Sequence, residues 1–478
     1  MTADIDWQRV AAGGALAFAA VICGLAAGVA PLASIYVAVA VAFLVIAITD
    51  LSLGLALFVF VSFVTIYNYS VYDVAVRGIL ILAWLMYVLS RRRSELDFQS
   101  VHPWAGGALI LFVAWCYLST AWSQDTGKAL LSATEYALSG FLLLITYTAV
   151  QSRRDLGRVL TAFLLGACAA IIYAFISPAA SEEGRLANQV LGPNVLGEAL
   201  VCGLAISAAL LALYRSSVMR LMTVAAGLFI GVGVLLTTSR SALIALVASL
   251  VAAVALAGRW RMIALCVTLV LAGGTYIYFE QFAPAGAKER IEEPLSSQQR
   301  SEDGRNTIWS LAVRAFEDQP VTGVGAGNFR VVQVKFLLRP GVDRARTQTS
   351  EVIDDPHGKV AHNSFLSVAS ELGIVGLVLF VFLIGFGAAS LLKAARLFKK
   401  LGDGHMQIVA ICLVVAMVGS LGVQMFQSQQ QEKVIWLLLG LGPALLAIAR
   451  SEARERGLLP DPRRRRTSQR PVPAYSPS

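Results

Sequence analysis

Long apolar runs recur along almost the whole chain and constrain its fold more than any other feature. About fourteen runs are long enough to cross the hydrocarbon core of a bilayer as helices, which takes about 20 residues each. They lie near residues 10–30, 31–49, 51–68, 72–90, 104–121, 130–150, 159–178, 192–214, 220–238, 240–257, 262–279, 364–392, 406–426 and 434–449. The sequence therefore predicts an all-α polytopic membrane protein with about 12–14 transmembrane helices.

The basic residues predict an orientation in a membrane rather than a nucleic-acid partner. The net charge is +9, yet only 14% of the residues are charged, against about 25% in soluble domains. Lys and Arg gather in alternate loops, at 91–93, 151–158, 215–220, 258–261, 393–400 and 463–466. The positive-inside rule places these loops and both termini in the cytoplasm. We therefore expect a multi-pass protein of the cell inner membrane with its remaining loops in the periplasm.

The topology divides the chain into five parts. They are N-terminal transmembrane helices (1–103), transmembrane helices that carry Arg and Asn motifs (104–279), a large periplasmic loop (280–361), C-terminal transmembrane helices (362–450) and a disordered basic cytoplasmic tail (451–478). The large loop is expected to be partly helical. Its apolar spacing predicts an amphipathic helix that begins at Asn306 or Thr307 and ends at Pro320. The glycines at 323, 325 and 327 predict a turn packed over a cavity; without a preceding strand or a following P-loop Lys, they do not indicate a nucleotide site.

Ionisable residues within the spans mark one side of the membrane. They are Arg77, Glu135, Glu198, Arg240 and Glu371. In the predicted topology each lies in the first half of a helix that runs from outside to inside. Any one of them alone is as readily an interfacial residue that reaches water. Because such residues are costly inside a bilayer, five on one side predict a polar cavity open to the periplasm.

Three motifs are suited to line such a cavity. GRLANQVLGPNVLG (184–197) places Arg185 in a loop and Asn194 at a helix start. TTSRSALIAL (237–246) places Arg240 in a tight turn between two spans. HNSFLSVASELGIVG (362–376) places His362 and Asn363 where the large loop returns to the membrane.

In combination these stretches resemble a known family. SRSALIAL, then GRNTIW…PVTGVGAGNF, then HNSFLSVASELGIVG, in this order, are similar to the core of the O-antigen ligase and O-antigen polymerase superfamily. GRLANQVLGPNVLG and LSTAWSQDTGKAL (118–130) fit the same family, and the resemblance covers roughly residues 104–445. It implies a metal-independent glycosyltransferase without a cofactor. The donor would be a glycan on undecaprenyl pyrophosphate, and the acceptor hydroxyl would belong to lipid A–core in a ligase or to another lipid-linked glycan in a polymerase.

The resemblance also implies residue roles. His362 matches the general base, Arg240 and Arg305 match the diphosphate-binding arginines, Arg185 is a further candidate for the diphosphate, and Asn363, Asn194 and Glu198 are expected to support the site. Chemistry agrees with this assignment. Arg stays ionised and offers a planar fork to a departing pyrophosphate, and a neutral His can accept a hydroxyl proton near pH 7. Asn363 or Glu371 could orient the imidazole, and His357 is the alternative base.

The number of spans slightly favours a polymerase over a ligase. A transporter or flippase of a lipid-linked glycan is the alternative class, because it too would carry charges in many spans. A purely structural scaffold would not need the Arg and His residues. The six cysteines all lie in apolar runs, and no Cys/His cluster predicts a metal site.

Overall fold

The computed structural model describes most of the chain. It covers residue 14 and residues 31–63, 69–91, 98–179, 184–188, 191–282, 296–338 and 358–460. The predicted span near 10–30, apart from residue 14, and His357 lie outside the described residues.

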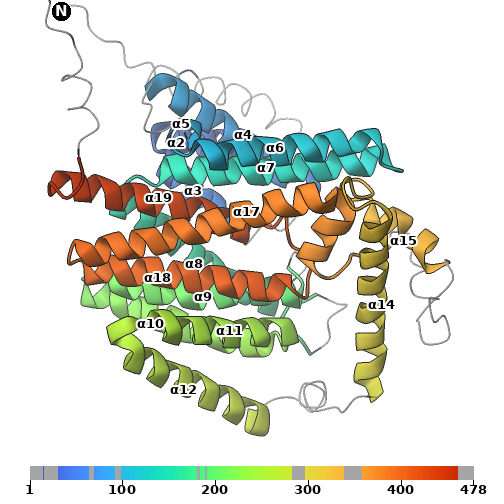
Figure 1. The fold of residues 1–478 in the computed structure, drawn as a ribbon. Coiled ribbons are helices and arrows are strands. Elements are labelled where there is room, and N and C mark those ends of the chain that lie inside the picture. Colours follow the sequence, from blue (N-terminus) through green and yellow to red (C-terminus); the bar gives the residue numbers. More distant parts are fainter. Residues whose placement is uncertain are drawn as a thin grey trace, which may run out of the picture.

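The described part of the chain is built from helices joined by short turns (Figure 1). The apolar helices are α2 (Pro31–Thr49), α3 (Leu51–Val61), α4 (Tyr69–Arg91), α6 (Pro103–Leu118), α7 (Thr126–Ala149), α8 (Arg153–Ile176), α9 (Pro193–Leu213), α10 (Ser217–Leu236), α11 (Arg240–Leu256), α12 (Arg261–Ile277), α17 (Ser364–Lys400), α18 (Gly404–Gln424) and α19 (Lys433–Glu455). Among the described residues nine helices, some with an adjoining short turn, are long and apolar enough to cross a membrane. Four shorter apolar helical stretches accompany them: Ala38–Thr49, Leu51–Val61, Val76–Ser90 and Arg240–Leu256. The prediction of an all-α polytopic membrane protein is confirmed.

Aromatic side chains hold the centre of the bundle together. The ring of Phe112 on α6 lies 5.2 Å from that of Tyr136 on α7, 6.0 Å from Phe380 on α17 and 6.4 Å from Trp436 on α19. All four side chains are buried. Large aromatic surfaces removed from solvent and lipid in this way fix the relative positions of the four helices.

The bundle has two chemically different ends. At the basic end, Arg153 at the start of α8 contacts Asp403 (2.7 Å) before α18 and Glu452 (2.6 Å) near the end of α19. At the motif end, α9, α11 and α17 begin and α18 ends, with Gly422 of α18 against Ala245 of α11. The loops predicted to be cytoplasmic at 151–158 and 393–400 adjoin the basic end, as the alternation of helix directions requires.

Two helices of the predicted large loop cover the motif end. They are α14 (Ser296–Asp318) and α15 (Phe329–Leu337), and Figure 1 shows α14 running across that end of the bundle. The prediction that α14 begins at Asn306 or Thr307 was wrong by about ten residues. Its first turns are polar (SSQQRSEDGR), so the apolar spacing that signals a helix only starts at Ile308.

The end of the bundle also differs from the sequence prediction. Helix α19 continues through Glu455, so the first residues of the predicted tail, from 451, belong to this helix. These residues are mostly polar and therefore gave no apolar signal for a helix. The division of the chain into five parts otherwise stays a prediction.

Candidate active site

Asn194 joins the starts of α9 and α11. Its side-chain oxygen accepts a hydrogen bond from the hydroxyl of Ser239 at 2.7 Å and one from Arg185 Nη2 at 3.4 Å. Arg185 Nε also donates to the carbonyl oxygen of Thr237 at 3.3 Å. Pro193 is the first residue of α9, where its missing N–H leaves no partner unsatisfied. Two of the three predicted motifs are therefore linked by hydrogen bonds.

The turn before α11 is strained and well anchored. Thr238 has φ 44°, a left-handed conformation that is unusual for a β-branched residue. Ser239 caps α11 by accepting a hydrogen bond from the amide of Ala242 at 3.3 Å. Arg240 is the first residue of α11, and its side chain is half-buried. Residual strain of this kind persists where surrounding structure fixes it, often at functional sites.

Glu198 lies one turn after Asn194, on the same face of α9. Its side chain is buried and accepts hydrogen bonds from Ser420 Oγ and, at 3.4 Å, from Gln424 Nε2. Both donors belong to the last turns of α18. The polar face of α9 therefore contacts α11 through Asn194 and α18 through Glu198.

His362 stands at the entrance to α17 in a second left-handed conformation. Its φ is 50°, and with Thr238 it is one of two non-glycine residues with positive φ in the described part of the chain. Ala361 before it is buried, and Asn363 after it caps α17 by accepting from the amides of Phe365 (2.9 Å) and Leu366 (3.1 Å). The flanking residues hold the half-buried His362 in place. The side-chain oxygen of Asn363 is thus engaged by the backbone of α17 rather than by the imidazole.

Contacts of α18 connect His362 with Arg240. Helix α11, which Arg240 begins, packs on the end of α18. The segment after α18 then reaches α17, where Ser364 Oγ donates to the carbonyl of Gln427 (2.9 Å) and accepts from the amide of Gln429 (2.9 Å). Ser364 is two residues from His362. The structure therefore places the predicted base and the predicted diphosphate ligand at the same end of the bundle.

Helix α14 packs beside this entrance. Ile308 and Leu311 of α14 form an apolar cluster with Ala361, and Leu366 borders that cluster. The ring of Trp309 lies 6.4 Å from that of Phe426 after α18. Arg305 belongs to α14, one turn before Ile308 and Trp309. Helix α14, which carries Arg305, therefore packs beside the entrance to α17.

A glycine loop (319–328) inserts where α17 is broken. Gly373 has φ 66° and ψ −166° inside α17, so carbonyls before it lack their helical partners. The amides of Val324 and Gly325 donate to the carbonyls of Ser370 and Glu371, both at 2.9 Å. Trp115 Nε1 donates to the carbonyl of Leu372 at 2.9 Å. The glycine turn predicted from the sequence is therefore the partner of a helix break.

Glu371 and Gly325 secure the same loop. The Glu371 carboxylate accepts from the amide of Gly327 at 2.9 Å, so this side chain holds the loop and not the His362 ring. Gly325 has φ 99°, and a Cβ there would lie 2.6 Å from Ser123 Cβ. Only glycine fits such a backbone at this separation.

The five ionisable residues of the spans have different surroundings. Arg77 and Glu135 form an ion pair at 2.7 Å between α4 and α7. Glu198 contacts α18 and Glu371 contacts the glycine loop, as described above, whereas Arg240 stands at the start of α11. These contacts give most of the five residues a structural role, and the polar cavity expected from the sequence stays a prediction.

The motif end carries groups suited to binding an anion and a proton acceptor at the same end of the bundle. Arg185 contacts Asn194 at the start of α9 and Arg240 begins α11, and helix dipoles at both starts also favour negative charge. Within the described residues no group of three or more His, Cys, Asp or Glu side chains is placed to hold a metal ion; metal independence stays a prediction.

Sequence reasoning missed several residues of this site. Ser239 could have been identified, because a Ser directly before an apolar helical run is an N-cap signal. Ser364, Ser420 and Gln424 gave no such signal, since their roles depend on which helices become neighbours.

Comparison with known proteins bears on the same region. Residues 225–381 match a family model described as O-antigen ligase. The match spans α11, the glycine loop and the entrance to α17, and so includes Arg240, Arg305 and His362. A search of curated proteins finds no match.

Proposed function

We propose, from the match of residues 225–381 to a family model described as O-antigen ligase, that the chain is an integral-membrane transferase of lipid-linked glycans. The donor is a glycan on undecaprenyl pyrophosphate and the acceptor is a sugar hydroxyl. The reaction takes place at the motif end, on the periplasmic side of the inner membrane. A membrane glycosyltransferase-like role in polysaccharide biosynthesis follows from the family itself.

One observation carries the proposal. Two non-glycine residues in the described part of the chain have left-handed conformations, Thr238 and His362, and they lie in two different family motifs at the same end of the bundle. Both conformations concern residues that the proposed reaction needs. Thr238 is two positions before Arg240, and His362 is itself the proposed base. Fixed, strained backbone keeps catalytic groups in place before the substrate arrives.

In the proposed mechanism the His362 imidazole removes the proton of the acceptor hydroxyl as its oxygen attacks the anomeric carbon. The glycosidic bond to the pyrophosphate breaks, and undecaprenyl pyrophosphate leaves with its electron pair. Arg240, with Arg305 and Arg185, stabilises the negative charge that develops on the phosphate oxygens. Asn194 and Glu198 support the site by fixing α9 against α11 and α18.

The acceptor decides between a polymerase and a ligase. We favour a polymerase slightly, because thirteen apolar helices are described and a further apolar run precedes them. Reconstitution into liposomes with a defined undecaprenyl-pyrophosphate oligosaccharide tests the proposal. Products that grow by whole repeats indicate a polymerase; a single transfer to added lipid A–core indicates a ligase. No transfer to either acceptor by folded protein would refute the proposed function.

A transporter remains the competing class for one structural reason. The break in α17 at Gly373 lies about 13 Å along the helix from its start, taking 1.5 Å per residue, and broken helices near the midplane are common in transporters. The two classes differ in their products: a transporter moves the labelled lipid-linked glycan across the liposome membrane without changing its mass. Movement without a new glycosidic bond would favour transport.

A further inference from the structure

A large cavity at the basic end lies opposite the candidate active site. It has a volume of about 900 Å³ and opens between α3, α8, the end of α9 and the start of α18. None of the residues assigned to the proposed transfer reaction lines this cavity, so an inference about the cavity does not depend on that reaction.

The walls of this groove are apolar. Leu53 and Leu57 of α3 face the space, as does Leu165 of α8. Leu53 is 38% exposed and Leu165 is 51% exposed, so the groove leaves hydrocarbon surface uncovered at the side of the bundle. A lipid acyl chain is the natural occupant of such a wall in a membrane protein.

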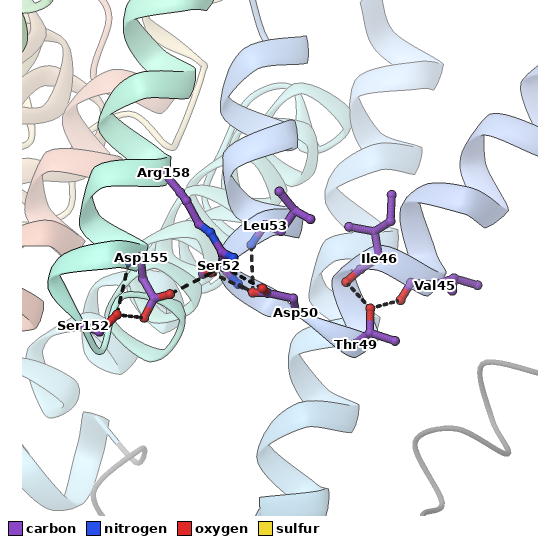
Figure 2. Close-up of polar contacts among 9 residues, drawn as sticks. All are labelled: Val45, Ile46, Thr49, Asp50, Ser52, Leu53, Ser152, Asp155 and Arg158. Atoms are coloured by element: carbon purple, nitrogen blue, oxygen red, sulfur yellow. Dashed lines mark hydrogen bonds and ion pairs between the residues drawn. The ribbon is translucent and has the colours of Figure 1, made fainter. Parts of the chain in front are cut away.

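One rim arginine, Arg158, is a structural part of the groove. Figure 2 shows its side chain reaching from α8 to the start of α3, where Nη1 contacts Asp50 Oδ2 at 2.6 Å and Ser52 Oγ at 2.8 Å. Arg158 also lies 3.7 Å from Asp155. These contacts hold α3 beside α8 and so set the width of the groove.

The carboxylates near the rim are engaged by helix starts as well as by arginines. Asp50 caps α3, accepting from the amides of Ser52 and Leu53, both at 3.1 Å. Asp403 caps α18, accepting from the amide of Met406 at 3.0 Å. Burial by itself would raise the pKa of Asp403, but the Met406 amide and Arg153 outweigh it and lower the pKa. Each helix start contributes roughly half a positive charge. The negative charges of Asp50 and Asp403 are therefore balanced by the helix starts and arginines that they contact.

Two other arginines of the rim remain available. Arg154 in the first turn of α8 and Arg215 after α9 line the same cavity, and both side chains are exposed. Neither has an acidic partner among the residues that the structure describes. Tyr214, beside Arg215, also lines the cavity, and such amphipathic rings favour the headgroup level of a bilayer.

We propose that this groove binds one anionic phospholipid from the leaflet at the basic end. Arg154 and Arg215 hold its phosphate, and an acyl chain lies along Leu53, Leu57 and Leu165. The cationic rim selects an anionic headgroup over a zwitterionic one. The apolar wall below it selects a lipid over a free anion.

Native mass spectrometry of the purified full-length protein tests this site. Phosphatidylglycerol and phosphatidylcholine are titrated separately, and bound lipid is counted. We expect one tightly retained phosphatidylglycerol and none of phosphatidylcholine. Because each surface arginine contributes about 1 kcal/mol to the attraction of anionic lipid, the double variant Arg154→Gln/Arg215→Gln should bind phosphatidylglycerol roughly 30-fold more weakly. The matched control is Arg396→Gln/Arg454→Gln, at exposed arginines of the same end outside the groove.

A second pair of variants tests the acyl wall. Leu165→Trp should fill the groove and abolish the retained lipid, whereas Leu111→Trp, at an exposed position of α6, should not. Unchanged elution and unfolding temperature show that each variant is folded. Equal loss in the control arginine pair, equal retention of phosphatidylcholine, or displacement of the lipid by millimolar inorganic phosphate would each overturn the proposal.

Discussion

The side-chain oxygen of Asn194 accepts a hydrogen bond from the Ser239 hydroxyl at 2.7 Å and so joins the starts of α9 and α11. If this bond positions Arg240, then Asn194→Ala and Ser239→Ala should each slow transfer, by about fivefold for a bond worth about 1 kcal/mol. The double variant should be little slower than either single variant, because the same bond is lost.

The measurement is a double-mutant cycle on the transfer rate of reconstituted protein. The matched control is Ser249→Ala, which should leave the rate unchanged. Ser249 lies on the same helix that Ser239 caps, but its hydroxyl donates a hydrogen bond to the carbonyl of Val415. Fully additive effects of the two substitutions would show that Asn194 and Ser239 act separately.

His362→Ala should abolish transfer, because loss of a general base typically costs about 10²–10⁴-fold. The variant should still insert, elute as a folded species and bind the lipid-linked donor. His357→Ala should cost much less. The reverse ranking would assign the base to His357. If both variants stay active, the base is not a histidine, and the carboxylates Glu135 and Glu198 become the candidates.

Arg240→Ala and Arg305→Ala should each slow transfer by roughly 100-fold, the effect of removing one positioned charge from a developing anion. Lys at either position should restore only part of the rate, because it lacks the planar fork. Arg261→Ala, an exposed arginine at the start of α12, serves as the control. A near-normal rate in Arg240→Ala would remove that residue from the site.

Transfer by the purified protein should survive EDTA. In the proposed reaction arginines, not a divalent cation, stabilise the leaving pyrophosphate. The assay compares rates before and after chelation, and after Mg²⁺ or Mn²⁺ is added back. A loss on chelation that either ion restores would contradict the arginine-based account.

Gly373→Ala should destabilise the protein by more than about 2 kcal/mol, because its φ of 66° strains any other residue and a Cβ would lie 2.2 Å from the carbonyl oxygen of Val321. Gly385→Ala is the matched control on the same helix. A Cβ there meets nothing within 4 Å, so it should be neutral or stabilising by roughly 0.5–1 kcal/mol. Equal unfolding temperatures for the two variants would show that the break is not required.

The sequence was most informative where local pattern decides structure. Apolar runs located the helices, because crossing a bilayer demands a minimum length of hydrocarbon-compatible residues. Pro193 marked the start of α9, and the three glycines marked the loop. Partners were not predictable: Glu371 looked like a possible orienter of His362, yet it accepts from Gly327. Likewise Arg77 and Glu135, 58 residues apart in sequence, pair with each other, which only the packing of α4 on α7 determines.

The break at Gly373 also bears on how the chain assembles during synthesis. Without the glycine loop and Trp115, the carbonyls of Ser370, Glu371 and Leu372 would lack hydrogen-bond partners, at several kcal/mol each within a bilayer. The loop precedes the break in the chain, so its amides have already been translated when the first part of α17 emerges. Trp115 has been translated earlier still. The N–H groups that pair with the broken part of α17 are thus synthesised before the carbonyls that they bind. The break in α17 can therefore be satisfied as soon as this helix packs against the preceding segments.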